Sequence, residues 1–182
     1  MRACGGNAMI RKKLAIFEAS SPEFSRYGAR VYASSKAPDA ACPEFRWWAN
    51  QGWPEMGGVP SVGLVESTGK DRHESRIFER HAATSETLIP VDADVVLVVA
   101  RSASLSGTEI DPESVRAFRV RRGEAVILHS GTWHYAPLTC APRARTFVVF
   151  DRRTPDGDVL KIDSEVDLGV TFAINLTEMA VT

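Results

Sequence analysis

Along most of the chain, hydrophobic residues alternate with polar ones or gather in short runs rich in Val, Ile and Phe. Gly, Pro and Asp separate these runs, a pattern typical of β-strands and turns. We expect strands over residues 14–19, 29–33, 45–49, 61–67, 75–81, 87–91, 94–101, 117–121, 124–129, 133–138, 145–152, 159–163 and 170–176. So many short strands predict an all-β sandwich or barrel.

Two segments carry the signals of short helices. In residues 20–28, Ser21 can cap a helix, Pro22 suits its first position, and Gly28 can end it. In residues 111–118, Asp111 and Pro112 offer the same start. The sequence therefore predicts one or two short helices beside the strands.

The chain has 182 residues, without repeats, low-complexity tracts or a clear linker. This length suits one domain, which we place over residues 14–182. Residues 1–13 precede the first strand and are expected to be a disordered extension.

The composition serves mainly to exclude classes of partner and of cysteine-based site. Charged residues make up 25% of the chain and the net charge is −1, without a basic cluster. This balance argues against nucleic acid and membrane partners and favours a small neutral or anionic substrate. The three cysteines, Cys4, Cys42 and Cys140, are widely spaced. We therefore expect neither a disulfide framework nor a zinc knuckle, and a reducing, cytoplasmic location.

Candidate chemistry begins with side chains that share one face of the strand over 75–81. Alternation turns Glu79 and His81 to one side and Arg80 to the other. Glu86 follows on the next strand, after a turn. The later stretch "GEAVILHSGTWHYAPL" places His129 and His134 at the ends of two neighbouring strands.

These residues resemble the two sequence motifs of the cupins. The pattern G-x5-H-x-G-x-x-H at 123–134 is similar to the second motif, with His129 at a position usually held by proline. Glu79, His81 and Glu86 occupy the places of the first motif's ligands, with Glu79 replacing a histidine. The resemblance implies a cupin-like jelly-roll β-barrel (a double-stranded β-helix). It also implies a divalent metal ion as candidate cofactor, held by Glu79, His81, Glu86 and His134.

Five segments resemble, in the same order, motifs of the ureidoglycolate lyase family: "PEFSRYGARVY", "FERHAATSETLIPV", "DPESVRAF", "GEAVILHSGTWHYAPL" and "TFVVFDRR". The resemblance covers most of residues 14–153. It implies a homodimeric enzyme that cleaves ureidoglycolate to glyoxylate and urea in allantoin and purine catabolism.

The chain also departs from the family pattern. The segment at 49–67 keeps Asn50 and Gly52 but lacks the family's Arg-Tyr-His. After Asp151-Arg152 the family's Asn-Cys is missing, and "TPDGDVLKID" stands in this region instead. Trp47, Trp48 and Trp53 lie in a tryptophan-rich stretch over residues 45–60, where we expect core packing, with a reshaped pocket or a dimer interface as alternatives. The resemblance therefore supports the fold further than the substrate.

His134 is the first candidate for the acid or base of such a reaction, because a histidine can do either near neutral pH. His81 and Glu86 are its candidate partners or, alternatively, ligands of a Lewis-acidic metal. His129 either takes part in catalysis or only shapes its loop.

A carboxylate substrate calls for a cation, and a guanidinium matches both of its oxygens. Arg80, Arg116 and Arg152 are the candidates, and the sequence does not choose among them. Trp133 either packs in the core or closes the mouth of the barrel over the substrate.

Two further functions stay open at this point. One is a metal-dependent cupin isomerase or lyase that acts on a sugar acid. The other is a cupin that binds a small metabolite without catalysis.

Overall fold

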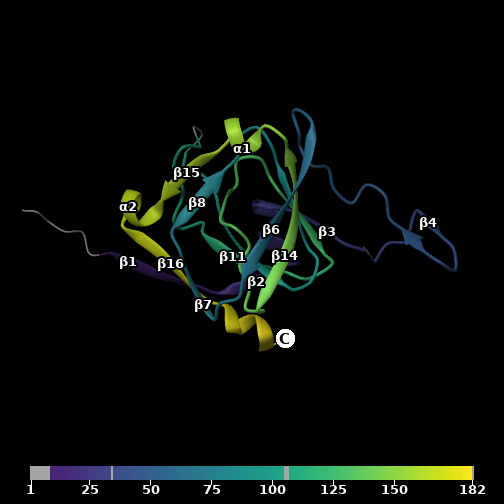
Figure 1. The fold of residues 1–182 in the computed structure, drawn as a ribbon, viewed down its shortest axis with the longest axis horizontal. Helices are drawn as coiled ribbons and strands as arrows, with labels where there is room; N and C mark the ends of the chain where they lie inside the picture. The colour runs from purple at the N-terminus through teal and green to yellow at the C-terminus, as the bar shows by residue number, and fades with distance from the viewer. Residues whose placement is uncertain (1–8, 34, 105–106, 182) are drawn as a thin grey trace, which may run out of the picture.

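Two β-sheets lie face to face, and a third, smaller sheet covers the outer side of one of them (Figure 1). These elements belong to a computed structural model that describes residues 9–33, 35–104 and 107–181. The six-stranded sheet has the order β15 (Leu160–Asp163), β8 (Ile77–Arg80), β13 (Trp133–His134), β10 (Val95–Ala100), β11 (Arg116–Val120) and β2 (Ile16–Glu18). The five-stranded sheet has the order β3 (Gly28–Val31), β12 (Ala125–Leu128), β9 (Glu86–Pro90), β14 (Arg143–Asp151) and β6 (Pro60–Thr68).

The covering sheet has the order β1 (Ile10–Leu14), β16 (Val170–Asn175) and β7 (Arg72–Ser75). The described residues also form four short helices: η1 (Pro22–Arg26), α1 (Thr154–Gly157), α2 (Ser164–Leu168) and η2 (Leu176–Val181). No helix of the described part is long and apolar enough to cross a membrane. The all-β, cupin-like jelly-roll fold expected from the sequence is confirmed, as is the first helix, which Ser21 caps at its start.

Strand β10 explains why the molecule has two hydrophobic cores. Its residues are all buried, and alternation sends Val95, Leu97 and Val99 into the space between the two larger sheets. Val96, Val98 and Ala100 point the other way, against Phe172 of the covering sheet, and form with it a second, outer core. An uninterrupted apolar run is what a strand needs when both of its faces are covered.

The prediction of a disordered extension over residues 1–13 is wrong for residues 10–13, while residues 1–8 lie outside the described part. Residues 10–14 form β1, which pairs in parallel with β16. Three consecutive basic residues, Arg11 to Lys13, make this strand look polar, but Leu14 packs against the outer core.

The second predicted helix, over 111–118, is also wrong. Asp111 does cap a turn, since its Oδ1 accepts a hydrogen bond from the amide of Glu113. The chain then enters β11, whose backbone pairs with β10 from Arg116 onward. Val115 and Ala117 are buried in the outer core, and this pairing outweighs the local helix signal.

Residues 35–49 form an arm with the two-stranded sheet β4 (Ala40–Ala41) and β5 (Arg46–Trp47), which projects away from the barrel in Figure 1. The expectation that the tryptophans of this region pack in the core is wrong for Trp47 and Trp53, which are 58% and 74% exposed. Trp48 is half-buried and donates its indole N–H to the carbonyl of Lys36.

Candidate active site

Four polar side chains meet at one end of the barrel because of how three strands pair. Glu79 on β8 lies directly opposite His134 on β13. His81 follows β8 on the same face as Glu79, and Glu86 opens β9, beside Leu128 of β12. The structure therefore brings together Glu79, His81, Glu86 and His134, which the sequence had placed in two separate motifs.

Glu86 lies between the two histidines. Its Oε1 is 3.3 Å from Nε2 of His81, and its Oε2 is 3.1 Å from Nε2 of His134. Oε1 of Glu79 is 3.8 Å from the same nitrogen of His134. Both imidazoles are about 95% buried, so water screens their interaction with the Glu86 carboxylate only weakly.

Backbone carbonyls hold the other nitrogen of each ring. Nδ1 of His81 donates to the carbonyl of Asp158 at 2.6 Å, and Nδ1 of His134 donates to that of Thr132 at 3.0 Å. A carbonyl only accepts, so each Nδ1 carries a proton and each neutral ring has its lone pair on Nε2. Nε2 of His134 is buried and, within the described residues, has no partner in hydrogen-bonding geometry.

The cluster shifts the pKa of two members in opposite directions. Burial alone would lower the pKa of His81, but the Glu86 carboxylate beside it outweighs burial and raises that pKa above its usual 6.5. Burial alone would raise the pKa of Glu86, but the two histidines hold it well below its usual 4.5. At neutral pH Glu86 is therefore charged, and a proton is favoured on His81.

The same donor set fits a divalent ion. One ligand atom from each of Glu79, His81 and His134 lies within 4.8 Å of the others. The carbonyls behind the rings orient both Nε2 atoms, as second partners of metal-binding histidines do. The unpartnered Nε2 of His134 is an atom that a cation would satisfy. These three residues would hold the ion, with Glu86 beside them.

A pocket of about 380 Å³ opens over this cluster. Its polar side is formed by the four clustered residues with Tyr135 and Lys161. The rest of its lining is largely apolar, with Val65, Leu88, Val148, Phe150, Pro155 and Val159 among its residues. The pocket thus combines a polar cluster with a hydrocarbon surface.

The other predicted site residues lie elsewhere. Arg80 turns to the opposite side of β8, with its guanidinium 6.0 Å from the ring of Trp133, which is fully buried in the outer core. Arg116 pairs with Glu23 at 3.0 Å, and Arg152 is exposed. None of these four residues lines the pocket.

His129 has an exposed side chain and does not line this pocket. It borders a small void together with His81, Glu86 and His134. The position therefore lies next to the cluster without entering the space that a substrate would occupy.

Sequence reasoning missed Lys161, Tyr135 and Thr154 as pocket residues. Lys161 lies opposite Glu79 across the β15–β8 pair, and its Nζ is 3.3 Å from Oε2 of Glu79. The segment "TPDGDVLKID", which differs from the family motif, did carry a sign of this, because alternation puts Val159 and Lys161 on one face of a strand. Nothing local shows which strand that segment would join.

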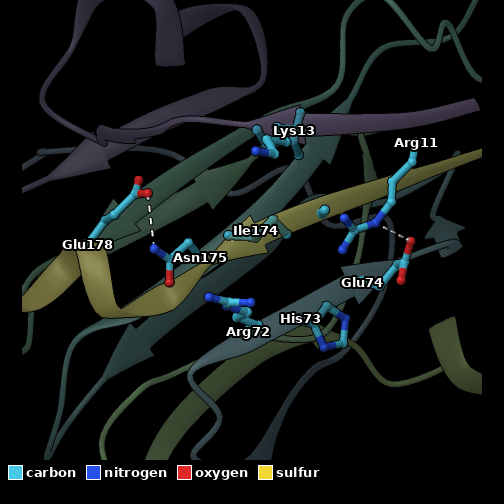
Figure 2. Close-up of a pocket in the computed structure, with 10 residues that line it drawn as sticks. Arg11, Lys13, Arg72, His73, Glu74, Ile174, Asn175 and Glu178 are labelled. Atoms are coloured by element: carbon cyan, nitrogen blue, oxygen red, sulfur yellow. Dashed lines mark hydrogen bonds and ion pairs between the residues drawn. The ribbon is translucent and has the colours of Figure 1, made fainter.

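A second groove lies on the outer face of the covering sheet (Figure 2). Charged side chains of β1 and β7 line it, and Arg11 and Glu74 form an ion pair across it at 3.0 Å. Glu74 also accepts from Thr171, and Glu178 accepts from Asn175. The Arg11–Glu74 pair links the two outer strands of this sheet across β16, and the other two contacts are also made within the sheet and its following helix. The groove is therefore a polar sheet surface whose charges are used by one another.

The sequence profile of a family described as ureidoglycolate lyase matches residues 11–170. The chain belongs to the ureidoglycolate lyase family. The matched range contains the whole cluster and Lys161, so the family resemblance seen in the sequence is confirmed. Among curated protein sequences, none matches this chain significantly.

Several solved structures share part of its shape. An oxalate decarboxylase mutant from Bacillus subtilis is 14% identical, with a TM-score of 0.39 over 58% of this chain and 24% of its own. A dTDP sugar isomerase from Desulfovibrio desulfuricans G20 is 13% identical, with a TM-score of 0.41 over 74% and 80%. Peruvianin-I, a cysteine peptidase from Thevetia peruviana latex, is 12% identical, with a TM-score of 0.37 over 81% and 92%. The chain spans about a quarter of the decarboxylase.

Proposed function

We propose that this protein is a carbon–nitrogen lyase that cleaves ureidoglycolate, or a close relative, to a 2-oxo acid and urea. The observation that carries the proposal is the pair of buried histidines whose Nε2 atoms both face Glu86 at the floor of one pocket. Membership of the ureidoglycolate lyase family supports the class of reaction.

Ureidoglycolate carries a hydroxyl and a ureido nitrogen on the same carbon, so cleavage needs a base and an acid. Nε2 of His134 takes the hydroxyl proton, and the oxygen electrons form the new carbonyl. The C–N bond breaks, its electrons pass to the nitrogen, and that nitrogen takes a proton from Nε2 of His81. The products are glyoxylate and urea. The raised pKa of His81 suits it to the acid role, while the lone pair on Nε2 suits His134 to the base role.

After one turnover His134 carries the extra proton and His81 lacks one. Glu86 lies between the two nitrogens, at 3.1 and 3.3 Å, and offers one oxygen to each. A proton can return to His81 through this carboxylate, which restores the starting state. The anchored Nδ1 atoms keep both rings in place during the exchange.

A divalent ion held by Glu79, His81 and His134 would supply Lewis-acid polarisation of a substrate oxygen. Both histidines would then use Nε2 for the ion, so this arrangement and the acid–base pair are alternatives. It would also suit the metal-dependent cupin isomerase or lyase as a second candidate function. The homodimer, the cytoplasmic location and the allantoin pathway stay predictions.

Glyoxylate release from ureidoglycolate tests the proposal, measured before and after treatment with a chelator and against a control without enzyme. Release that rises with enzyme concentration and survives chelation supports the acid–base pair. Release that disappears with the chelator and returns with a divalent ion supports the metal arrangement. No release above the control contradicts the lyase proposal.

A further inference from the structure

Part of the pocket beyond the four clustered side chains comes from a segment in which this chain departs from the family's motif. Residues 154–163 contain α1, the turn after it and β15, and they supply Thr154, Pro155, Val159 and Lys161 to the pocket. The same segment also positions His81 through the carbonyl of Asp158. This segment therefore shapes both the chemistry and the space above it.

Lys161 is the one lysine or arginine among the residues that line this pocket. Its ammonium lies 3.3 Å from Oε2 of Glu79, and 62% of its side chain is exposed. An incoming carboxylate can therefore reach it at the pocket's polar side. Thr154 adds a buried hydroxyl that, within the described residues, has no hydrogen-bond partner. The arginines considered from the sequence do not line the pocket, so Lys161 takes the role expected of them.

The apolar part of the pocket lining does not match ureidoglycolate. That molecule has a polar atom on each of its carbons, and it is small beside the ligands that fill pockets of about 300–1,000 Å³. Here 380 Å³ is available, and Val148 and Phe150 of β14, with Val65 of β6, present hydrocarbon to it. A polar ligand gains no binding free energy from this apolar surface, whereas a hydrocarbon group would bury it away from water and bind more tightly.

We propose that the pocket selects carboxylic acids that carry a hydrocarbon group, with Lys161 holding the carboxylate and the β14 wall holding the hydrocarbon. The inference rests on the proposed function only in placing the substrate in this pocket. Under that function the preferred substrate would be a hydroxy-ureido acid with an alkyl substituent, cleaved more efficiently than ureidoglycolate.

Binding of two stable hydroxy acids, glycolate and 2-hydroxyhexanoate, tests this without any turnover, by isothermal titration calorimetry on the full chain. We expect 2-hydroxyhexanoate to bind about tenfold more tightly or better, since each buried methylene adds to affinity. Equal binding, tighter binding of glycolate, or no binding of either acid would overturn the proposal.

Variants separate the two halves of the pocket. Phe150→Ala should lower the preference for 2-hydroxyhexanoate several-fold, while Phe147→Ala should not, because Phe147 is on the same strand but 42% exposed on the outer face. If Phe150→Ala does not fold, Val159→Ser at the exposed rim serves the same purpose. A preference that neither Phe150→Ala nor Val159→Ser changes would contradict the apolar half.

Lys161→Met should weaken both acids by about tenfold and leave their ratio unchanged, because it removes the charge opposite the carboxylate. Lys161→Arg should restore most of the affinity. Unchanged binding in Lys161→Met would contradict the assignment of Lys161 to the carboxylate.

Failure of ureidoglycolate cleavage leaves these binding results intact, so the two proposals fail separately. N-butylureidoglycolate links them, because its cleavage releases glyoxylate in the same assay.

Discussion

Two carboxylates mark the two ends of strand β10, and both have basic neighbours. Asp94 precedes the strand, and its Oδ2 accepts from Nε and Nη2 of Arg119 at 2.8 and 2.6 Å. Its Oδ1 accepts from the amide of Arg122. At the other end, where Val99 pairs with His134, Glu86 lies 3.1–3.3 Å from two imidazole nitrogens. One of these nitrogens has no hydrogen-bond partner within the described residues.

The difference separates a structural charge pair from a reactive one. The oxygens of Asp94 are used by donors with good geometry, which stabilises the fold and leaves nothing for a ligand. The Glu86 cluster faces a pocket, and its Nε2 atoms are still available for a proton, a substrate or a metal ion. A buried polar atom without a hydrogen-bond partner destabilises the fold, and such atoms are retained where function needs them.

The largest effect should come from His134→Gln, which keeps an amide in place of the ring but removes the base. We expect glyoxylate release to fall by about 10²–10⁴-fold, the range that general acid–base catalysis contributes. Steady-state kinetics measures this, with a thermal melt to show that the variant folds. A fully active, folded variant would show that His134 is not in the catalytic machinery.

Glu86→Gln should lower kcat by about 10²-fold and change the pH profile. The charge of Glu86 raises the pKa of His81, so the wild-type acid stays protonated above pH 6.5. Without that charge His81 loses its proton at lower pH, and the alkaline limb of the rate profile should move toward acid. An unmoved limb in a pH–rate measurement would contradict the assignment of His81 as the acid.

Asp94→Asn should affect stability and leave kcat/KM unchanged. We expect a loss of about 1–2 kcal/mol in the free energy of unfolding at neutral pH, measured by urea denaturation. Burial alone would raise the pKa of Asp94, but the hydrogen bonds from the Arg122 amide and the Arg119 guanidinium together outweigh it and hold that pKa below its usual 3.8. Its contribution is therefore present above that pH and lost as pH falls through the lowered value, so wild type and variant should converge in acid. A constant difference down to about pH 3 would speak against the charge as its source.

Arg116→Met should have the smallest effect, within about 1 kcal/mol of stability, because its partner Glu23 is near the surface. We expect KM for any carboxylate substrate to stay unchanged, since Arg116 does not line the pocket. A large rise in KM would show that Arg116, and not Lys161, binds the substrate carboxylate.

The sequence predicted much of the site because each motif is local. Alternation on one strand placed Glu79 and His81 together, and the cupin-like spacing added Glu86 and His134. It could not decide among three arginines, since the pairing that turns Arg80 toward Trp133 and ties Arg116 to Glu23 joins distant segments. For the same reason Lys161 was missed: its partner Glu79 is far away in sequence and becomes its neighbour only through the β15–β8 register.

By itself the sequence determined the all-β class, the family and the residues that could carry acid–base chemistry. These follow from side-chain period and residue type, which are properties of short segments. The tertiary structure decided that residues 10–14 form a strand, that 111–118 do not form a helix, and which cation faces the pocket. Each of these outcomes depends on backbone pairing between distant segments, whose hydrogen bonds and buried area override local preference.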